Sequence, residues 1–448
     1  MKAGKINAGG VSMQEMTGEE RKKFKYWQWR TIIGTMIGYS LFYFVRKNLS
    51  VATPFMLEEG LFDKEQIGFI VMLHGLVYGI SKFANGIIGD RVNSRIFMVA
   101  GLVLAALCNV LFGFSASLLM FGVFWLCNGW VQGMGFPPCA RLITHWVRPD
   151  ELATKMSVWN SSHSVGAGLV LVFCGYIPGL VTMLTGWFPG VETLGWRWYF
   201  YLPAAVSLLG AVFLWFTLRD TPSSVGLPEI AGRAAKTEET VEFRQFVRKR
   251  VFQNPTIWML GFAAFFVYTI RFAVLDWGPT LLYEWAGIQI KSSVWMIAGF
   301  ELVGIVGTLV AGWVADRFFG GRAVRVCVIG LALTVVSLLL FMYLPHSPLL
   351  MTVLLMAAGF FVYGPQALNG VIASNLVTNR ASATAIGFTS LFAYSSTILS
   401  GWLMGRIADR YGWEPGLLLL VVAGILGVGV FASLWNIQVH GYEDQDTN

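Results

Sequence analysis

Residues 43–60 read YFVRKNLSVATPFMLEEG, and residues 268–287 read YTIRFAVLDWGPTLLYEWAG. Placed 225 residues apart, the two stretches match at several positions, among them Tyr43 and Tyr268, Arg46 and Arg271, Pro54 and Pro279, and Glu59 and Glu284. A second pair, GIIGDRVNSR at 86–95 and GWVADRFFGGR at 312–322, follows at an offset of 226 and shares the pattern Gly-x-x-x-Asp-Arg. Self-similarity at a fixed spacing indicates a repeated structural unit. The chain is therefore predicted to contain two copies of one unit.

The composition is typical of a membrane protein. Of 448 residues, 56% are hydrophobic and only 13% are charged, whereas soluble domains average about a quarter charged residues. Apolar runs of about 20 residues, the length that a helix needs to cross a bilayer, recur along the whole chain. The weak alternating pattern of a transmembrane barrel is absent. These features predict an all-α membrane protein that lies in a lipid bilayer.

Twelve apolar runs are candidate transmembrane helices, and they fall into two groups of six, one for each copy of the repeat. The predicted domains are an N-terminal segment (1–28), a first six-helix bundle (29–219), a linker (220–252), a second six-helix bundle (253–438) and a tail (439–448). The linker is the longest polar segment and ends in Arg248-Lys249-Arg250. The runs centre near Tyr39, Val77, Ala105, Leu126, Val165, Val206, Ala264, Ile305, Leu333, Phe361, Ala393 and Gly424.

Basic residues in short loops predict the orientation, because cytoplasmic loops are enriched in Lys and Arg. The N-terminal segment and the loops after the second, fourth and eighth helices carry such residues, whereas the first loop is mostly acidic. Both termini are therefore predicted to be cytoplasmic. Arg406 and Arg410, at the outer end of the eleventh helix, and the acidic tail fit this rule less well. No removable signal peptide is expected, because no small-residue cleavage site follows the first apolar run.

Arg46 and Arg271 lie in the middle of apolar runs, where an arginine costs about 2.5–3.5 kcal/mol on insertion scales. Parallel repeats are related by an axis along the membrane normal, and they bind substrate near the midplane at their interface. The two arginines are thus predicted to face one central cavity. Two guanidinium groups repel each other unless an anion lies between them, and their planar donor forks match phosphate oxygens. The repeat therefore predicts a phosphate-binding site.

The alternative is that each arginine pairs with a carboxylate in its own half. Asp276 and Glu301 are candidates for Arg271, whereas the first apolar run offers no carboxylate to Arg46. Lys47 follows Arg46 by one residue, about 100° around a helix, and is expected to balance charge rather than to bind substrate. Lys47, Asp276 and Glu301 are accordingly predicted to be charge-balancing residues.

Other charged groups break the repeat. Lys82 aligns with Thr308, and His163 lies among small residues in the fifth helix. Both are candidate substrate contacts; the alternatives are snorkelling of Lys82 to the membrane surface and a satisfied core histidine. Polar residues that could donate hydrogen bonds to phosphate or sugar, or simply pack, are Tyr39, Tyr43, Asn160, Tyr268, Tyr363 and Tyr394.

The two Gly-x-x-x-Asp-Arg loops are interpreted as gates. Glycine allows close helix approach, and Asp90, Arg91, Asp316 and Arg317 could bridge helices in one conformation and separate in another. A third copy, GRIADR at 405–410, ends the eleventh helix at the other face.

Together these motifs resemble the major facilitator superfamily and, more closely, its organophosphate:phosphate antiporters, which include glycerol-3-phosphate, hexose-phosphate and phosphoglycerate transporters. The similarity runs from about Lys25 to Trp435 and is carried by GYSLFYFVRKN, YGISKF, GWVQGMGFPPCAR, SVWNSSHSVG, LRDTPSSVGLP, FVYTIRFAVLDWGPTLL and FFVYGPQ. It implies the twelve-helix major facilitator fold, and it places the family's phosphate-binding arginines at Arg46 and Arg271, its lysine at Lys82 and its histidine at His163.

The resemblance implies exchange of an organic phosphate for inorganic phosphate by alternating access, by a monomer in a bacterial inner membrane. LFGFSASLLMFGVFWLCNGWVQG and CARLITHW favour the hexose-phosphate branch, and glucose-6-phosphate as substrate. The uncharged eleventh helix (383–404) departs from that branch, so glycerol-3-phosphate and phosphoglycerate stay open. His163 could select the ionisation state of the phosphate, because the ordinary pKa of histidine is close to the second pKa of phosphate.

Other classes of function are weighed against this one. A membrane sensor of external sugar phosphate would carry the same site. An enzyme such as a phosphatase would need a nucleophile or a metal cluster, and neither is found in the sequence; the five cysteines match no metal spacing and are expected in the core. A proton-coupled sugar porter would need midplane carboxylates without paired arginines. No cofactor or metal is expected. Nucleic acid is not expected either, because the basic residues cluster at loops, as membrane topology would place them.

Overall fold

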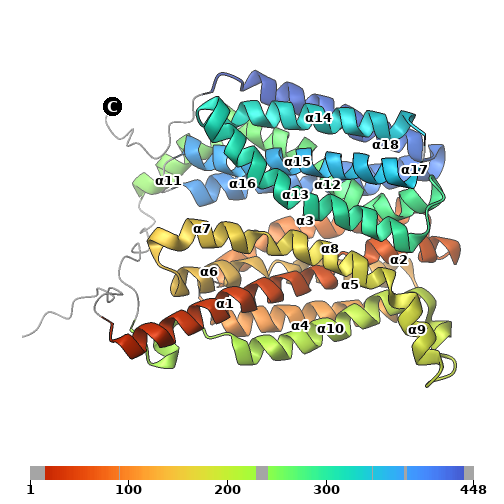
Figure 1. Cartoon of the computed structure of the whole chain (residues 1–448), viewed down its shortest axis with the longest axis horizontal. Coiled ribbons are helices and arrows are strands. Elements are labelled where there is room, and N and C mark those ends of the chain that lie inside the picture. Colours follow the sequence, from red (N-terminus) through yellow and green to blue (C-terminus); the bar gives the residue numbers. More distant parts are fainter. Residues whose placement is uncertain (1–15, 90, 229–240, 346, 378–380, 438–448) are drawn as a thin grey trace, which may run out of the picture.

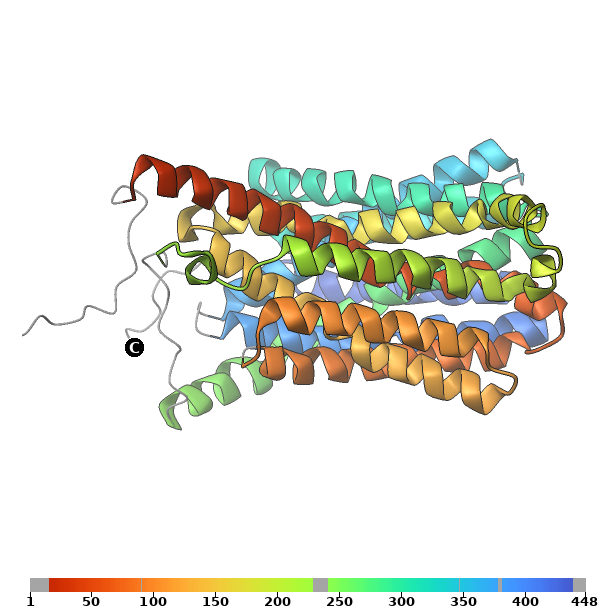
Figure 2. The same cartoon turned by 90° about the horizontal axis from the view of Figure 1, so that it is seen from below.

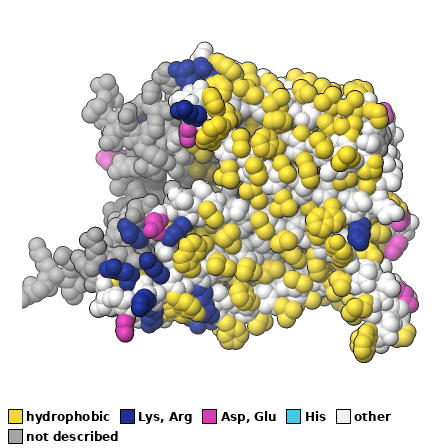
Figure 3. Space-filling view, viewed as in Figure 1, with side chains coloured by type: hydrophobic (Ala, Val, Ile, Leu, Met, Phe, Trp, Pro, Cys, Tyr) yellow, Lys and Arg dark blue, Asp and Glu magenta, His cyan; other side chains and the backbone are white. Residues whose placement is uncertain are grey.

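The computed structural model describes residues 16–89, 91–228, 241–345, 347–377 and 381–437. Within these ranges the chain folds into helices without a β-strand. The long helices run side by side along the long axis of the molecule (Figures 1 and 2). Large apolar side chains such as Phe83 and Leu209 are exposed on their outer faces. In Figure 3, apolar side chains cover the middle of the molecule, where a membrane protein contacts lipid.

The first bundle is built from helices that come before residue 218. Several of its spans are interrupted, so that two short helices replace one long helix. Its elements are α1 (Gly18–Phe44), α2 (Asn48–Glu58), α3 (Lys64–Gly89), α4 (Ser94–Gly113), α5 (Leu118–Gln132), α6 (Phe136–Trp146), α7 (Pro149–Asn160), α8 (Ser162–Gly175), α9 (Ile177–Thr185), η1 (Val191–Arg197) and α10 (Trp198–Thr217).

The second bundle has longer, mostly continuous helices. Short elements in the predicted linker precede it: η2 (Pro222–Val225), α11 (Val241–Val247) and η3 (Arg248–Phe252). The bundle comprises α12 (Pro255–Glu284), α13 (Ile290–Phe319), α14 (Ala323–Tyr343), α15 (Pro348–Leu376), α16 (Ser382–Ser395), η4 (Ile398–Leu403), α17 (Met404–Tyr411) and α18 (Trp413–Ser433).

The elements agree with twelve membrane passes once the interrupted spans are joined. By length and hydropathy alone, eight helices among the described residues are long enough to cross a membrane, or nine with the bent pair α7–α8 and α9. Breaks divide the other spans: α1 from α2, α5 from α6, and α16 from α17. Helix α1 has 27 residues, so it falls short in hydropathy rather than in length. At the second of these breaks, glycines precede Pro137 and Pro138, and proline suits the first turn of a new helix.

Glycines bring the two bundles into close contact. A Cβ added at Gly68 of α3 would run into the carbonyl oxygen of Gly401 in η4, and one at Gly405 of α17 would run into the carbonyl oxygen of Lys64. Such approach of backbone to backbone is possible only without a side chain. The bundles therefore touch through α3, η4 and α17.

The molecule has two distinct ends. We call the end that carries the first described residues and the linker the terminal end, and the end that carries residues 59–64, 285–289 and 411–413 the distal end (Figure 1). Lys and Arg gather at the terminal end (Figure 3). The repeat is visible at the distal end, where Glu59 accepts a hydrogen bond from the Trp196 indole and its counterpart Glu284 accepts one from Trp413.

Candidate functional site

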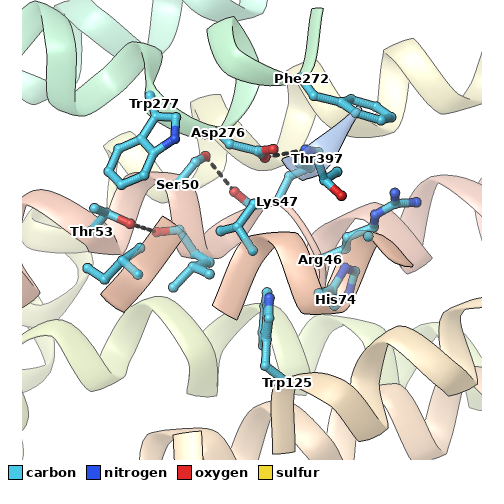
Figure 4. Close-up of a pocket in the computed structure, with 14 residues that line it drawn as sticks. Arg46, Lys47, Ser50, Thr53, His74, Trp125, Phe272, Asp276, Trp277 and Thr397 are labelled. Atoms are coloured by element: carbon cyan, nitrogen blue, oxygen red, sulfur yellow. Dashed lines mark hydrogen bonds and ion pairs between the residues drawn. The ribbon is translucent and has the colours of Figure 1, made fainter. Parts of the chain in front are cut away.

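Arg46 and Lys47 lie at the break in the first transmembrane span. Helix α1 ends at Phe44 and α2 begins at Asn48, so the two cations occupy the non-helical link between them. In Figure 4, Lys47 reaches toward Asp276, whereas Arg46 lies beside His74. The two side chains therefore enter different surroundings, as their spacing predicts.

The guanidinium of Arg46 is held by aromatic rings. Its central carbon lies 4.1 Å from the centre of the Tyr78 ring and 5.6 Å from that of Tyr43. Among the described residues, no carboxylate lies within ion-pair distance of Arg46. Cation–π contacts stabilise a desolvated guanidinium without neutralising its charge. Arg46 thus keeps its hydrogen-bond donors and its positive charge for an anion.

Arg271 has a different environment, because it pairs inside its own bundle. On the continuous helix α12, its Nη2 lies 3.2 Å from Oε1 of Glu301 on α13, and its Nε donates to the Tyr363 hydroxyl at 2.8 Å. The side chains of both Arg271 and Glu301 are buried. The predicted alternative that Arg271 pairs with a carboxylate of its own half therefore describes this structure, with Glu301 as the partner rather than Asp276.

Asp276 instead accepts a hydrogen bond from Lys47 of the other bundle. The pair is largely buried, with side-chain exposures of 7% for Lys47 and 13% for Asp276. The Lys47 ammonium also lies 5.4 Å from the centre of the Phe272 ring. This ion pair joins the two bundles beside the arginines.

Lys82 points along the same aromatic surface. Its ammonium lies 4.7 Å from the Phe136 ring centre and 5.6 Å from that of Tyr394 in the second bundle. The described residues provide no carboxylate within ion-pair distance of Lys82. Tyr394 in turn packs edge-on against Tyr78 at 4.8 Å and lies 6.5 Å from Tyr268. These rings connect the surroundings of Arg46 with those of Lys82.

The remaining predicted residues fall on α1, α7 and α8. The His163 ring lies 6.3 Å from that of Tyr43, and its Nδ1 contacts the backbone carbonyl of Asn160. Tyr39 packs against Trp159 at 5.1 Å. The side chain of Asn160 is exposed.

Toward the distal end the site narrows to a cavity of about 30 Å³, which is the volume of about one water molecule. Arg46, Lys47 and Asp276 line it together with other residues that Figure 4 shows: Ser50, Thr53, His74, Trp125, Phe272, Trp277 and Thr397. Beyond this cavity, the backbone contacts of Gly68 and Gly405 close the distal end.

Ion pairs reinforce this closure. Lys64 lies 3.0 Å from Glu284, and Glu65 lies 3.2 Å from Arg410 and 3.7 Å from Arg406. Each pair joins the two bundles. The third Gly-x-x-x-Asp-Arg copy therefore supplies contacts between the bundles, which explains why two arginines lie at an end that the charge rule predicts to be poor in cations.

The described residues of the two copies that were predicted to be gates make no such contact. Asp316 and Arg317 are exposed and form no ion pair with another described residue. Arg91 is also exposed, and Asp90 lies outside the described residues. Between described residues, the hydrogen bonds and ion pairs that join the bundles lie at the distal end or beside the arginines. The described parts of these two loops thus do not join the bundles in this conformation, and their role as gates stays a prediction.

Sequence reasoning missed Tyr78, Phe136 and Phe272, the rings that contact Arg46, Lys82 and Lys47. Tyr78 stands four residues before Lys82 in YGISKF, so it lies one helical turn from that lysine and on the same face. That spacing is the signal that could have identified it. Phe136 and Phe272 come from other helices, and their proximity depends on packing.

Comparison with known proteins agrees with this architecture. The family model described as Major Facilitator Superfamily matches residues 35–401 and 286–438. A probable hexose phosphate transport protein of Chlamydia pneumoniae is 34% identical over 93% of this chain and 93% of its own length. The glycerol-3-phosphate transporter of Bacillus subtilis is 34% identical over 92% and 93%, and the membrane sensor protein UhpC of Escherichia coli is 33% identical over 93% and 94%.

These matches extend over nearly the whole length of each protein, so the resemblance that the motifs carried is not confined to one segment. The chain belongs to the organophosphate:phosphate antiporter family of the major facilitator superfamily, whose members are membrane transporters and related sensors rather than enzymes.

Proposed function

We propose that this protein exchanges an organic phosphate for inorganic phosphate across a bacterial inner membrane, as a monomer with cytoplasmic termini. The observation that carries the proposal is the charge of the central site. Arg46, Lys47, Lys82 and Arg271 supply four positive charges, and Asp276 and Glu301 supply two negative charges. The two cations that lack a carboxylate partner among the described residues match a phosphate dianion.

The arrangement of the arginines supports exchange rather than one-way transport. An empty site leaves the Arg46 guanidinium desolvated without a counter-charge, and enclosing it further in a low-dielectric interior is unfavourable. A bound phosphate dianion removes that penalty, whether it is inorganic or carries an organic group. The loaded carrier therefore changes conformation faster than the empty one, which couples the movement of one phosphate to the return of another.

The closed distal end supports alternating access. Ion pairs and backbone contacts hold the bundles together there. Substrate in this conformation reaches the arginines from the terminal end. Rocking of the bundles about the site would break the distal contacts and bring the Gly-x-x-x-Asp-Arg loops of the terminal end together.

A sugar phosphate such as glucose-6-phosphate is the favoured organic substrate, because a hexose phosphate transport protein is among the most similar relatives. The similarity to a glycerol-3-phosphate transporter keeps that substrate, and phosphoglycerate, as alternatives. A sensor of external sugar phosphate is a second candidate function, since a membrane sensor is 33% identical over a similar length.

An uptake assay in liposomes distinguishes a transporter from a sensor. Purified protein is reconstituted with or without internal phosphate, and uptake of labelled glucose-6-phosphate, glycerol-3-phosphate and 3-phosphoglycerate is followed. Uptake of one ester that requires internal phosphate is the expected result and identifies the substrate. Binding of an ester without any uptake would instead favour the sensor, and absence of both would contradict a phosphate site.

A further inference from the structure

We infer that Asn109, Asn128 and Gln132 are positioning residues for Arg46, because their side-chain amides hold the break in the first span from which this arginine projects. We call these three residues the amide clamp. The inference deepens the proposed function and rests on it, since it concerns how the phosphate-binding guanidinium is oriented. Asn109 is on α4, and Asn128 and Gln132 are on α5.

The break leaves backbone carbonyls without their usual helical donors. In a regular helix, the N–H of Arg46 would donate to the carbonyl of Phe42, four residues earlier. It donates instead to Tyr43 at 3.2 Å, which frees the carbonyl of Phe42. Gln132 fills this place, because its Nε2 donates to the Phe42 carbonyl at 2.9 Å.

The other two amides converge on the next carbonyl along the break. Nδ2 of Asn109 lies 2.7 Å from the Val45 carbonyl oxygen, and Nδ2 of Asn128 lies 3.1 Å from it. Val45 immediately precedes Arg46, so these bonds fix the peptide group from which the arginine departs.

The acceptor oxygens of the clamp are also occupied. Oδ1 of Asn109 accepts from Asn48 at 2.7 Å, and Oδ1 of Asn128 lies 3.2 Å from Nε2 of His74. The three clamp side chains are at most 3% exposed. Both clamp asparagines use their donors and their acceptors, and a buried network of this kind is rigid, so helices α4 and α5 determine the direction of Arg46.

The break that the clamp holds has no counterpart in the second bundle. Helix α12 continues through Arg271, and the repeat places Ile270 at the position of Val45 and Ala273 at that of Asn48. Helix α14, which corresponds to α4, contains neither Asn nor Gln.

The two arginines differ in the charge of the groups that orient them. Arg271 is oriented by the carboxylate of Glu301, and that carboxylate competes with a bound anion. Neutral amides that bind the backbone orient Arg46 without reducing its charge. The two arginines are thus positioned by different means, and only Arg46 offers an uncompensated charge to phosphate.

The test compares full-length Gln132→Met and Asn128→Ser with Ser207→Ala. Ser207 is a matched control, because its buried hydroxyl donates to the Leu41 carbonyl of the same helix before the break. The Kd of inorganic phosphate and the melting temperature are measured in detergent for each protein. We expect the Kd to rise about tenfold in each clamp variant and to stay unchanged in Ser207→Ala.

A double-mutant cycle distinguishes positioning from general destabilisation. In an Arg46→Lys background, which keeps a charge but lacks the guanidinium fork, Gln132→Met and Asn128→Ser should raise the Kd no further. If the clamp variants bind phosphate with the Kd of the wild type, whatever their melting temperature, the inference is wrong but the proposed function is unaffected. An equal rise of the Kd in the Arg46→Lys background would also overturn it. Failure of the wild type to bind phosphate would overturn the proposed function together with the inference.

Discussion

Lys47 of the first bundle and Asp276 of the second form a largely buried ion pair that crosses the interface between the two repeats. In the sequence, Lys47 follows the arginine of one copy, and Asp276 follows the arginine of the other by five residues. The pair therefore connects the broken first span directly to α12, at the level of the two arginines.

Removal of one partner of this pair should destabilise the protein. A buried charge that has lost its partner costs about 3–5 kcal/mol. We expect Lys47→Met and Asp276→Leu each to lower the melting temperature in detergent, and the double variant to lower it by less than the sum. Strictly additive losses in this cycle would show that the two residues do not interact.

Replacement of the two arginines by lysine should separate their roles. Lysine keeps the charge but not the planar fork, and hydrogen bonds to charged groups are worth about 1.5–3 kcal/mol. The initial rate of phosphate exchange should fall by about tenfold or more in both Arg46→Lys and Arg271→Lys. Only Arg271→Lys should also lower the melting temperature clearly, because it loses Glu301 and Tyr363.

Arg197→Lys, at the distal loop, is the control for the arginine variants and should exchange phosphate normally. Full exchange by Arg46→Lys would contradict the argument from guanidinium geometry.

Neutralisation of Glu301 should strengthen phosphate binding. Its carboxylate shares Arg271 with any incoming anion, so Glu301→Gln makes that guanidinium a stronger site. We expect the Kd of inorganic phosphate to fall by about tenfold, equivalent to 1.4 kcal/mol. The melting temperature should drop, because Arg271 is then buried without its counter-charge. Calorimetric titration measures the first effect, and weaker binding would contradict the competition between carboxylate and phosphate.

A side chain at the closest backbone contact should open the distal end. Gly68→Ala forces a Cβ against the Gly401 carbonyl, and overpacking of this kind costs about 1–3 kcal/mol. Gly86→Ala, on the same helix, meets no atom within 4 Å and is the matched control. The distance between two spin labels, one on each bundle at the distal end, can be measured by electron paramagnetic resonance. It should lengthen in Gly68→Ala and stay unchanged in Gly86→Ala. Equal distances in both variants would mean that this contact does not keep the distal end closed.

The ion pairs of the distal end should respond to salt. Glu65 binds both Arg406 and Arg410, and the three side chains are partly exposed. Such pairs contribute at most about 1 kcal/mol each and weaken as ionic strength rises. Glu65→Gln should therefore increase the population that is open at the distal end, and added salt should do the same to the wild type. Glu192→Gln, an exposed residue of the same end, is the control.

Much of the architecture could be predicted from residue order alone. The spacing of YFVRKNLS and YTIRFAVL identifies a repeat, and the repeat with its apolar runs predicts two bundles with Arg46 and Arg271 at equivalent positions. These features depend on hydrophobicity and on self-similarity, both of which are properties of the chain itself. The charge of the site could be predicted for the same reason, because cations in apolar runs are conspicuous.

Only the tertiary structure decided which groups meet. Asp276 is five residues from Arg271, yet it pairs with Lys47, whereas Glu301 on the next helix pairs with Arg271. The third Gly-x-x-x-Asp-Arg copy joins the bundles, while the described parts of the other two copies do not. The repeat also fails to predict that the first span breaks at Arg46 while α12 continues through Arg271. Ion pairs and helix breaks depend on side chains that other helices supply, and those distances are set by packing in three dimensions.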